Sequence, residues 1–221
     1  MFTAQMVINT METATPRKTT IITLQELDDK DASSHDIFLF KKLFPSGEAD
    51  YWDVIRRCIL IRNFTLGDSL IACILTHIDF TLEPLVINKA PQEPVFVYPG
   101  KVIVNGDLDT ADRIFVKRLD VKGKLTVRSD KDGNYGGISG DVEAYEIDLS
   151  GDGADYGGVI WGKATGKKIN VTNRGMIFGE ANSDEINVFD GCIKGIATCK
   201  VLNLSKNGRV DEINAEVVNR L

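Results

Sequence analysis

Apolar and polar residues alternate from Val104 to Val210, and the alternation returns about every seventeen positions. The repeated unit places an apolar residue, a glycine and a small or apolar residue at every second position. It reads Val104-Gly106-Leu108, Val121-Gly123-Leu125, Ile138-Gly140-Val142, Ile160-Gly162-Ala164, Ile177-Gly179-Ala181 and Ile193-Gly195-Ala197, with a degenerate last copy, Val210-Glu212-Asn214. A period of two predicts strands and excludes helical repeats. The longer fixed period predicts a solenoid, whose units bury their apolar sides only against one another.

A second apolar pair follows about five residues after most of these units. The pairs are Ile147 and Leu149, Ile169 and Val171, Ile186 and Val188, and Leu202 and Leu204. Each coil therefore needs at least two short strands with a corner between them. We predict a mostly β protein with a small α module. Residues 82–221 are expected to form a parallel β-helix of seven or eight coils with about 17 residues per coil, and residues 1–81 a tail and a helical cap.

The glycines of the repeat are predicted to form one structural column: Gly106, Gly123, Gly140, Gly162, Gly179 and Gly195. Glycine inside a strand costs roughly 0.5–1 kcal/mol relative to alanine, so a column of glycines needs a physical cause. Two causes are available, a bend with positive φ or a wall so narrow that no Cβ fits. Burial of the apolar positions, on the order of 1.5–3 kcal/mol each, outweighs the glycine cost and favours stacking.

Residues 1–81 lack the repeat and predict a short strand and three helices. Met1–Arg17 has no periodicity and predicts a loose tail, Lys18–Leu24 is β-branched and predicts a strand, and Leu27–Ser34 predicts a polar break. The predicted helices are His35–Phe44, capped by Ser33 or Ser34; Glu48 to Ile61, capped by Ser46; and Thr65 to Ile78. Their short connections predict antiparallel neighbours.

Both ends of a β-helix need covering, because an open end exposes unpaired backbone and apolar side chains. We expect the helical module to cap the first coil, which begins at Leu85-Val86-Ile87. At the other end, Asp211–Arg220 predicts either a terminal strand or a short helix. Its charges favour an ordinary polar cap. The alternative is an assembly surface made of Val217, Val218 and Leu221.

Composition narrows the function classes. A net charge of −6 disfavours broad binding to nucleic acid or to anionic membranes. The sequence has neither a secretory leader nor an apolar run of about eighteen residues, which predicts a cytoplasmic protein without a membrane span. Its four cysteines, Cys58, Cys73, Cys192 and Cys199, form no CxxC pair and lack metal-ligand spacing. We therefore expect reduced thiols and no cofactor.

Two similar acidic insertions, Asp130–Gly137 and Asp152–Gly158, interrupt the repeat. Oxygen-rich loops of this kind suit calcium; the candidate ligands are Asp130, Asp132, Asn134, Asp152 and Asp155. However, Tyr135 stands where a calcium-binding helix–loop–helix needs glycine, and the terminal bidentate glutamate is missing. Solvated turns are the favoured interpretation, with Tyr135, Tyr156, Asp132 and Asp155 at loop tips that contact a protein partner.

The sequence offers no catalytic constellation. Its two histidines, His35 and His77, precede the repeat, and no nucleophile can be placed beside a general base. Left-handed hexapeptide acyltransferases have a shorter stride, and carbohydrate-active β-helices have wider coils with paired acids. Lys163, Lys167, Lys168 and Arg174 form a basic cluster, which is expected to be a solvated face or to meet an acidic partner.

The alternating Val/Ile–Gly–small repeat over Leu85–Asn214 resembles the bactofilins, bacterial polymer-forming cytoskeletal proteins with a right-handed β-helical core. The segment Phe44–Tyr51 is similar to the helical preface of uncharacterised bacterial proteins that continue into Gly-Ile-rich repeats such as Ile177–Ala181. Resemblance to bactofilins implies a non-enzymatic scaffold that self-associates through its ends. This chain differs from them in carrying a helical module instead of short disordered tails.

The leading hypothesis is a cytoplasmic structural or scaffolding protein that binds other proteins or itself. An alternative is an acidic inhibitor or decoy whose loops, through Asp130, Asp132, Asp152 and Asp155, occupy the nucleic-acid-binding site of a partner enzyme. A third is a carbohydrate-active β-helix.

Overall fold

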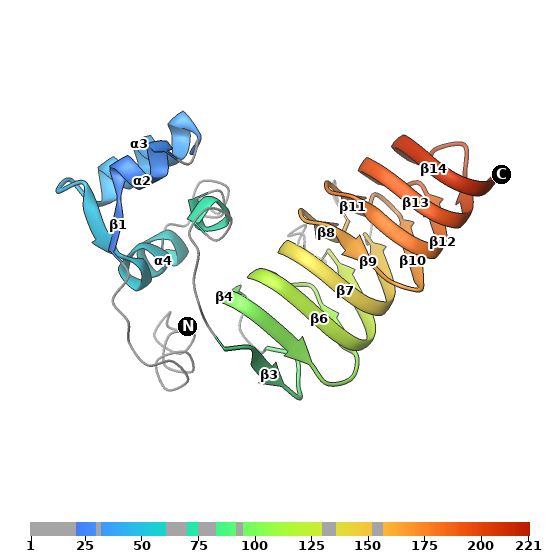
Figure 1. Cartoon of the computed structure of the whole chain (residues 1–221), viewed down its shortest axis with the longest axis horizontal. Coiled ribbons are helices and arrows are strands. Elements are labelled where there is room, and N and C mark those ends of the chain that lie inside the picture. Colours follow the sequence, from blue (N-terminus) through green and yellow to red (C-terminus); the bar gives the residue numbers. More distant parts are fainter. Residues whose placement is uncertain are drawn as a thin grey trace. The chain divides into compact units, whose positions relative to one another are not determined.

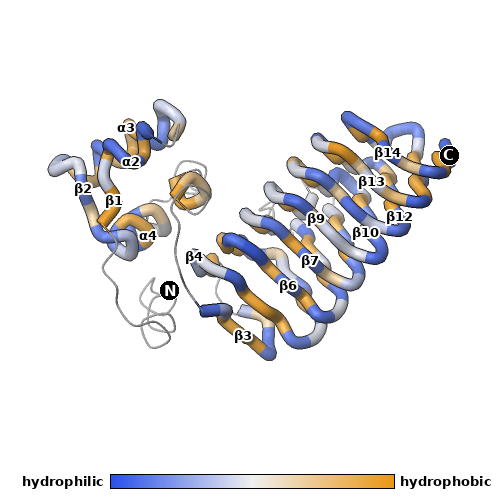
Figure 2. The backbone as a smooth tube through the Cα atoms, viewed as in Figure 1, coloured by the Kyte–Doolittle hydropathy of each residue, from blue (hydrophilic) through white to orange (hydrophobic). Residues whose placement is uncertain are grey.

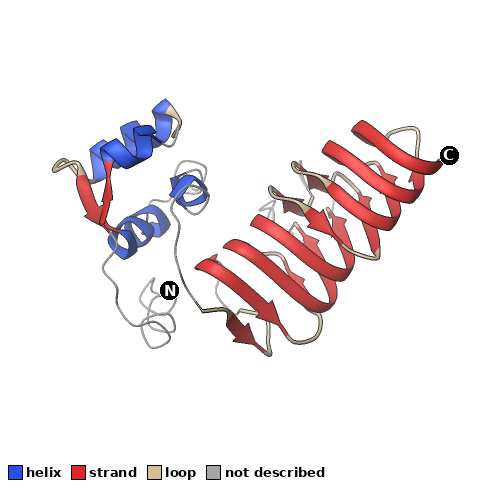
Figure 3. Cartoon of the chain, viewed as in Figure 1, coloured by secondary structure: helices blue, strands red, loops and turns tan. Residues whose placement is uncertain are grey.

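The computed structural model describes residues 21–29, 32–60, 70–74, 83–91, 95–129, 136–151 and 157–221. The chain divides into two compact units, Met1–Phe80 (unit 1) and Thr81–Leu221 (unit 2), drawn in Figure 1. Strands predominate, and helices are confined to the described part of unit 1 (Figure 3). The predicted fold class, mostly β with a small α module, is confirmed at this level.

Unit 1 combines a two-stranded antiparallel sheet with short helices. Its described elements are β1 (Ile21–Thr23), α2 (Leu24–Asp29), α3 (Ser34–Leu43), β2 (Glu48–Asp50), α4 (Tyr51–Leu60) and a helical segment at 70–74. β1 pairs with β2, so that Ile22 lies opposite Ala49. Ile22, Phe40, Val54 and Ile74 have fully buried side chains and form part of an apolar core.

The start of α2 was missed by the sequence analysis, which predicted a polar break from Leu27. The Thr23 hydroxyl accepts the Glu26 N–H at 3.2 Å, and Glu26 Oε2 accepts the Thr23 N–H at 2.9 Å. This reciprocal pair is a capping box, which starts a helix. α2 then buries Leu27, the one apolar residue that the predicted break contained near its start.

Ser33 caps α3, and its hydroxyl accepts the Asp36 N–H at 3.1 Å. The cap predicted at Ser46 is wrong, because the Ser46 hydroxyl donates to the Glu48 carbonyl at 2.9 Å and residues 48–50 form β2. Pairing with β1 overrides the helical preference of this segment. α4 begins only at Tyr51.

Other predictions for unit 1 fall partly outside the described residues. Of the predicted strand Lys18–Leu24, Ile21–Thr23 forms β1. Lys18–Thr20 and the predicted tail lie outside the described part of the chain. Of the third predicted helix, residues 70–74 are described and are helical.

Unit 2 contains a 12-stranded sheet in which every pairing between described strands is parallel. Its strands are β3 (Leu85–Ile87), β4 (Val95–Val104), β5 (Leu108–Thr110), β6 (Arg113–Arg128), β7 (Gly137–Ser150), β8 (Val159–Ile160), β9 (Ala164–Thr165), β10 (Lys168–Thr172), β11 (Met176–Ile177), β12 (Ala181–Phe189), β13 (Cys192–Leu204) and β14 (Arg209–Arg220). In Figure 1 the successive neighbours along the sheet include β3, β4, β6, β7, β10, β12, β13 and β14.

The strands of unit 2 pair at nearly constant separations along the sequence. Leu85 pairs with Val102, and Lys168 with Glu185, in each case seventeen residues on. Ala181 pairs with Ala197, sixteen residues on. Where the segments 130–135 or 152–156 intervene, the separation grows to between 22 and 24 residues, as for Ile138 and Ile160. The second insertion lengthens the connection without changing which residue types pair, whereas the first also shifts the pairing, so that Val121 lies opposite Ala144.

The predicted apolar positions of unit 2 are buried. Ile160, Ile177 and Ile193 lie in one register column, Ile169, Ile186 and Leu202 lie in another, and none of the six has an exposed side chain. The tube in Figure 2 accordingly alternates between hydrophobic and hydrophilic residues along the strands. Strands such as β10 and β13 therefore bury one set of side chains and leave the intervening set outside, whereas β14 has no buried side chain.

The six glycines predicted to share one column occupy two. Val121 pairs with Ala144 rather than with Ile138, because the insertion at 130–135 shifts the phase of the repeat. Gly106 and Gly123 therefore stack on each other in one column. Gly140, Gly162, Gly179 and Gly195 form the other, in which each Cβ after the first would lie 2.3–2.5 Å from the carbonyl oxygen of the preceding glycine.

Both causes considered for the glycines occur. Gly106 and Gly140 have φ of +111° and +125°, a conformation that L side chains rarely adopt. The later glycines are required by close backbone approach. A further glycine column, which was not predicted, lies two residues before the buried isoleucine column and contains Gly136, Gly158, Gly175, Gly191 and Gly208.

Candidate functional site

The last strand of unit 2 presents a long unpaired edge. β14 spans 12 residues, Arg209–Arg220, and among the described strands it pairs with β13 alone. The sequence left a strand and a short helix open for Asp211–Arg220, and the strand is correct. A free edge presents a row of N–H and C=O groups that can pair with another chain.

Apolar side chains are uncovered along this edge. Val218 continues the column of Ile186 and Leu202, both fully buried, but its own exposed fraction is 39%. Val217 is 49% and Leu221 69% exposed. The three residues predicted as an assembly surface therefore lie on the last strand or directly after it, with Val218 in the open apolar column and Val217 on the other face of the strand.

Charged side chains also occupy this end. Arg220 pairs with Leu204 and so stands in a position that is apolar in the preceding strand. Glu212 lies opposite Ile196 at an irregularity in the ladder. Charge on an edge strand limits indiscriminate pairing with other chains.

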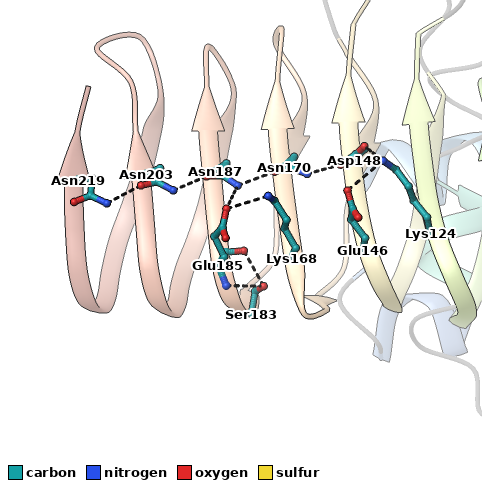
Figure 4. A network of polar contacts seen from close by, with 10 residues as sticks. All are labelled: Lys124, Glu146, Asp148, Lys168, Asn170, Ser183, Glu185, Asn187, Asn203 and Asn219. Carbon is teal, nitrogen blue, oxygen red and sulfur yellow. Dashed lines mark hydrogen bonds and ion pairs between the residues drawn. The ribbon is translucent and has the colours of Figure 1, made fainter.

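A ladder of asparagine side chains runs along unit 2 to β14 (Figure 4). Asn187 Nδ2 donates to Asn170 Oδ1 at 2.8 Å, Asn203 Nδ2 to Asn187 Oδ1 at 2.7 Å, and Asn219 Nδ2 to Asn203 Oδ1 at 2.8 Å. Such amide ladders stabilise stacked parallel strands in register. All the bonds point the same way, and Asn219, which is exposed, ends the ladder.

The other end of the ladder is an acid. Asn170 Nδ2 donates to Asp148 Oδ1 at 2.6 Å, and Asp148 also forms an ion pair with Lys124. Hydrogen bonds to Asp148 and Glu146 raise the pKa of Lys124. The ladder therefore begins at a carboxylate, that of Asp148, whose negative charge is balanced by Lys124.

A second charged pair supports the middle of the ladder. Asn187 Nδ2 donates to Glu185 Oε1 at 2.8 Å, and Lys168 Nζ lies 3.1 Å from the same carboxylate. The hydrogen bond from Asn187, followed by that from Lys168, lowers the pKa of Glu185. Towards β14 the column that contains Lys168 and Glu185 becomes apolar, with Val201 and Val217. This column of side chains thus loses its charged residues as it approaches the open edge.

The acidic loop residues predicted as partner contacts or calcium ligands all lie outside the described residues. They are Asp130, Asp132, Asn134, Tyr135, Asp152, Asp155 and Tyr156. Within the described ranges no group of three or more His, Cys, Asp or Glu side chains could hold a metal ion. The calcium and acidic-decoy hypotheses thus remain predictions from the sequence.

The predicted basic cluster is largely engaged within the chain. Lys163 pairs with Glu180 at 3.1 Å, Lys168 with Glu185, and Lys167 lies over the ring of Tyr145 at 5.5 Å. Exposed pairs of this kind contribute little to stability, but they leave less free charge for an acidic partner.

The thiols and histidines form no nucleophilic site among the described residues. Burial, and then the charge of Asp36, raise the pKa of Cys73 to about 11. Burial also raises the pKa of Cys199, and none of the four cysteines, all within the described ranges, forms a disulfide. His35 is exposed on α3, and His77 lies outside the described ranges. A raised thiol pKa disfavours the reactive thiolate.

None of the described helices has the length and apolar character needed to cross a membrane. Comparison of the chain with protein-family models, with curated proteins and with solved structures gave no match.

Proposed function

We propose that unit 2 is a β-solenoid with about 17 residues per coil and that the protein is a non-enzymatic scaffold, which self-associates through β14 and binds other proteins. The observation that carries this proposal is the unpaired edge of β14, where an apolar column that is buried in earlier strands becomes exposed. The resemblance of the repeat to bactofilins is consistent with it.

The register supports a solenoid. Parallel partners lie sixteen to eighteen residues apart wherever no insertion intervenes, and the buried columns keep apolar residues from strand to strand. Parallel strands cannot be joined by tight hairpins, so each must be reached by a longer connection. Here that connection contains further strands of the same sheet, as expected for a coil.

The energetics support a reversible assembly. Complete burial of a valine or leucine side chain contributes about 1.5–3 kcal/mol, and Val217, Val218 and Leu221 are partly covered already. Association itself costs on the order of 4–15 kcal/mol. Backbone pairing along β14 must therefore supply the remainder, as it does when a strand is added to a sheet edge. We expect association that depends on concentration.

The opposite end of the sheet offers a poorer edge. β3 spans 3 residues, Leu85–Ile87, and is preceded by Pro84. Proline has no N–H to donate to a ladder. β14 is four times as long, so we assign the assembly surface to β14.

The test measures molecular mass over a wide range of protein concentration, by light scattering behind size exclusion, and inspects the sample by electron microscopy. The parent chain is expected to gain mass as concentration rises. Val217→Lys should suppress this gain, because a lysine on an edge strand opposes pairing.

Val86→Lys is the matched control, since Val86 on β3 is 54% exposed. It should leave the gain in mass unchanged. A parent chain that stays monomeric throughout, or assembly lost in Val86→Lys and kept in Val217→Lys, would contradict the proposal.

A further inference from the structure

Two shallow pockets of unit 2 follow one another along one line across the strands. The first, of about 320 Å³, is lined by residues 120–122, 143–145 and 165–167, and the second, of about 500 Å³, by residues 182–184, 198–200 and 214–216. They are neighbours, because Thr165 pairs with Asn182 in parallel register. Together these six triplets form what we call the transverse groove.

The middle residue of each triplet forms the floor of the groove. From β6 to β14 the floor contains Val121, Ala144, Gly166, Ser183, Cys199 and Ala215. Apart from Val121 these are small, and the register places Ser183, Cys199 and Ala215 directly beside one another. Small residues leave the space between the two walls open.

One wall begins with two carboxylates, Asp120 and Glu143, which both form ion pairs with Arg118, and then continues with neutral hydrogen-bonding groups. Thr165, Asn182, Thr198 and Asn214 occupy four consecutive strands in register. The Nδ2 atom of Asn182 is covered and has no hydrogen-bond partner among the described residues, although the side chain as a whole is only half-buried. A rotation that brings this amide to a ligand therefore breaks no hydrogen bond of that nitrogen.

The other wall combines an aromatic ring with three lysines and two acids. It contains Lys122, Tyr145, Lys167, Asp184, Lys200 and Glu216. Lys200 Nζ lies 2.7 Å from Asp184 Oδ1, and Tyr145 is 59% exposed. A groove for nucleic acid would present unbalanced positive charge. Over both walls the groove carries four carboxylates and three lysines, and this near balance of charge beside amides and hydroxyls suits an uncharged polar ligand.

The spacing of the wall residues selects among uncharged polymers. Adjacent strands lie about 4.7–4.9 Å apart, so the wall offers a hydrogen-bonding group at that interval. The distance that an extended β-linked pyranose chain advances per sugar is close to this strand spacing. An extended peptide advances only about 3.2–3.4 Å per residue and falls out of step with the wall. We propose that the transverse groove binds a neutral, β-linked glycan that runs across the strands.

The carboxylates of the groove indicate binding without hydrolysis. A glycosidase needs an acid whose pKa is raised, opposite a second carboxylate. Burial would raise the pKa of Asp120, but hydrogen bonds from Lys101 and Arg118 outweigh it and hold the pKa below its ordinary value. Glu143 also pairs with Arg118. Asp120 is therefore not prepared to donate a proton to a glycosidic oxygen.

Isothermal titration of the full chain tests the groove. The probes are the β-1,4-linked hexasaccharides of glucose and of N-acetylglucosamine, with an oligogalacturonate and an extended Ser-Gly hexapeptide as competitors of other chemistry. At least one neutral hexasaccharide is expected to bind saturably and in preference to both competitors.

Variants locate the binding. Thr198→Val removes one wall hydroxyl and should weaken binding at least about fivefold. Tyr145→Ala removes the exposed ring and should also weaken it. Thr126→Val, on β6 outside the groove, is the matched control and should have no effect, and all three variants should melt at the temperature of the parent chain.

Absence of saturable binding by either neutral hexasaccharide would overturn the proposal. So would preferential binding of the oligogalacturonate or the peptide, or equal affinity in the Thr198→Val and Thr126→Val variants. The groove does not depend on self-association. If the chain is monomeric and still binds the hexasaccharide, the glycan-binding proposal therefore stands and only the proposed assembly is contradicted.

Discussion

The two units use contacts of different kinds. In unit 1 each stabilising contact occurs once: β1 meets β2 through a short antiparallel ladder, and α2 and α3 each begin at a single cap. In unit 2 one contact is repeated from strand to strand, as in the asparagine ladder and the stacked glycines. A substitution in unit 1 should therefore remove one interaction. A larger side chain in a glycine column of unit 2 should instead clash with the backbone of the neighbouring strand.

This contrast can be measured because the chain contains two tryptophans, Trp52 in unit 1 and Trp161 in unit 2. Single-tryptophan variants, Trp52→Phe and Trp161→Phe, report the urea unfolding of one unit each. A substitution that acts within a unit should move only the transition of its own reporter.

The largest effect is expected for Gly179→Ala. Its Cβ would lie 2.4 Å from the carbonyl oxygen of Gly162, and neither backbone can move without disturbing the next strand. Overpacking of this kind costs about 3 kcal/mol or more. The free energy of unfolding reported by Trp161 should fall by that amount, while the transition reported by Trp52 stays in place.

Gly106→Ala is the control that separates packing from backbone conformation. An added Cβ meets nothing within 4 Å there, but φ is +111°. The expected loss is only the strain of that conformation, about 1–2 kcal/mol. If Gly106→Ala is the more damaging of the two, close approach is not what requires the later glycines.

An intermediate effect is expected for Asp120→Asn, with a dependence on pH. Asp120 is buried on β6 and forms ion pairs with Lys101 and Arg118, which leave its pKa lowered in the folded chain. A lowered carboxyl pKa contributes stability above the unfolded value, near 3.9, and that contribution is lost as pH falls towards the folded value. The substitution should cost about 2 kcal/mol at neutral pH.

The difference between the parent chain and Asp120→Asn should shrink as the pH is lowered through about 4, measured by urea unfolding of unit 2 at several pH values. Asp53→Asn in unit 1 is the control, since the exposed pair of Asp53 with Arg56 is worth at most about 0.5 kcal/mol. A difference for Asp120→Asn that stays constant with pH would show that the carboxylate charge is not the cause.

Much of unit 2 could be predicted, because a period of two within a longer period is visible in the residues themselves. The buried columns, such as Ile160, Ile177 and Ile193, followed directly from that pattern. The prediction that six glycines share one column was wrong, because an insertion between strands changes which residues pair although the sequence motif itself is unchanged. The asparagine ladder was missed, although Asn170, Asn187, Asn203 and Asn219 recur at the same interval as the apolar residues.

Unit 1 was less predictable, because its structure depends on single contacts between distant segments. Glu48-Ala49-Asp50 favours a helix locally, yet it forms β2 by pairing with Ile21–Thr23. The capping box of Thr23 and Glu26 was visible in the sequence, but the polar residues after it suggested a break. The transverse groove could not be predicted, since its walls come from residues whose adjacency depends on the corrected register.

The smallest effect is expected for Ser33→Ala in unit 1. The Ser33 hydroxyl accepts the Asp36 N–H at 3.1 Å and donates to Asp36 Oδ2 at 2.6 Å, so its loss removes the cap of α3. Such a loss typically costs about 1 kcal/mol. The transition reported by Trp52 should shift by this amount and that of Trp161 should not. Ser46→Ala is the matched control, because the exposed Ser46 hydroxyl donates to the Glu48 carbonyl and caps no helix. If Ser46→Ala costs as much as Ser33→Ala, the cap is not what stabilises the start of α3.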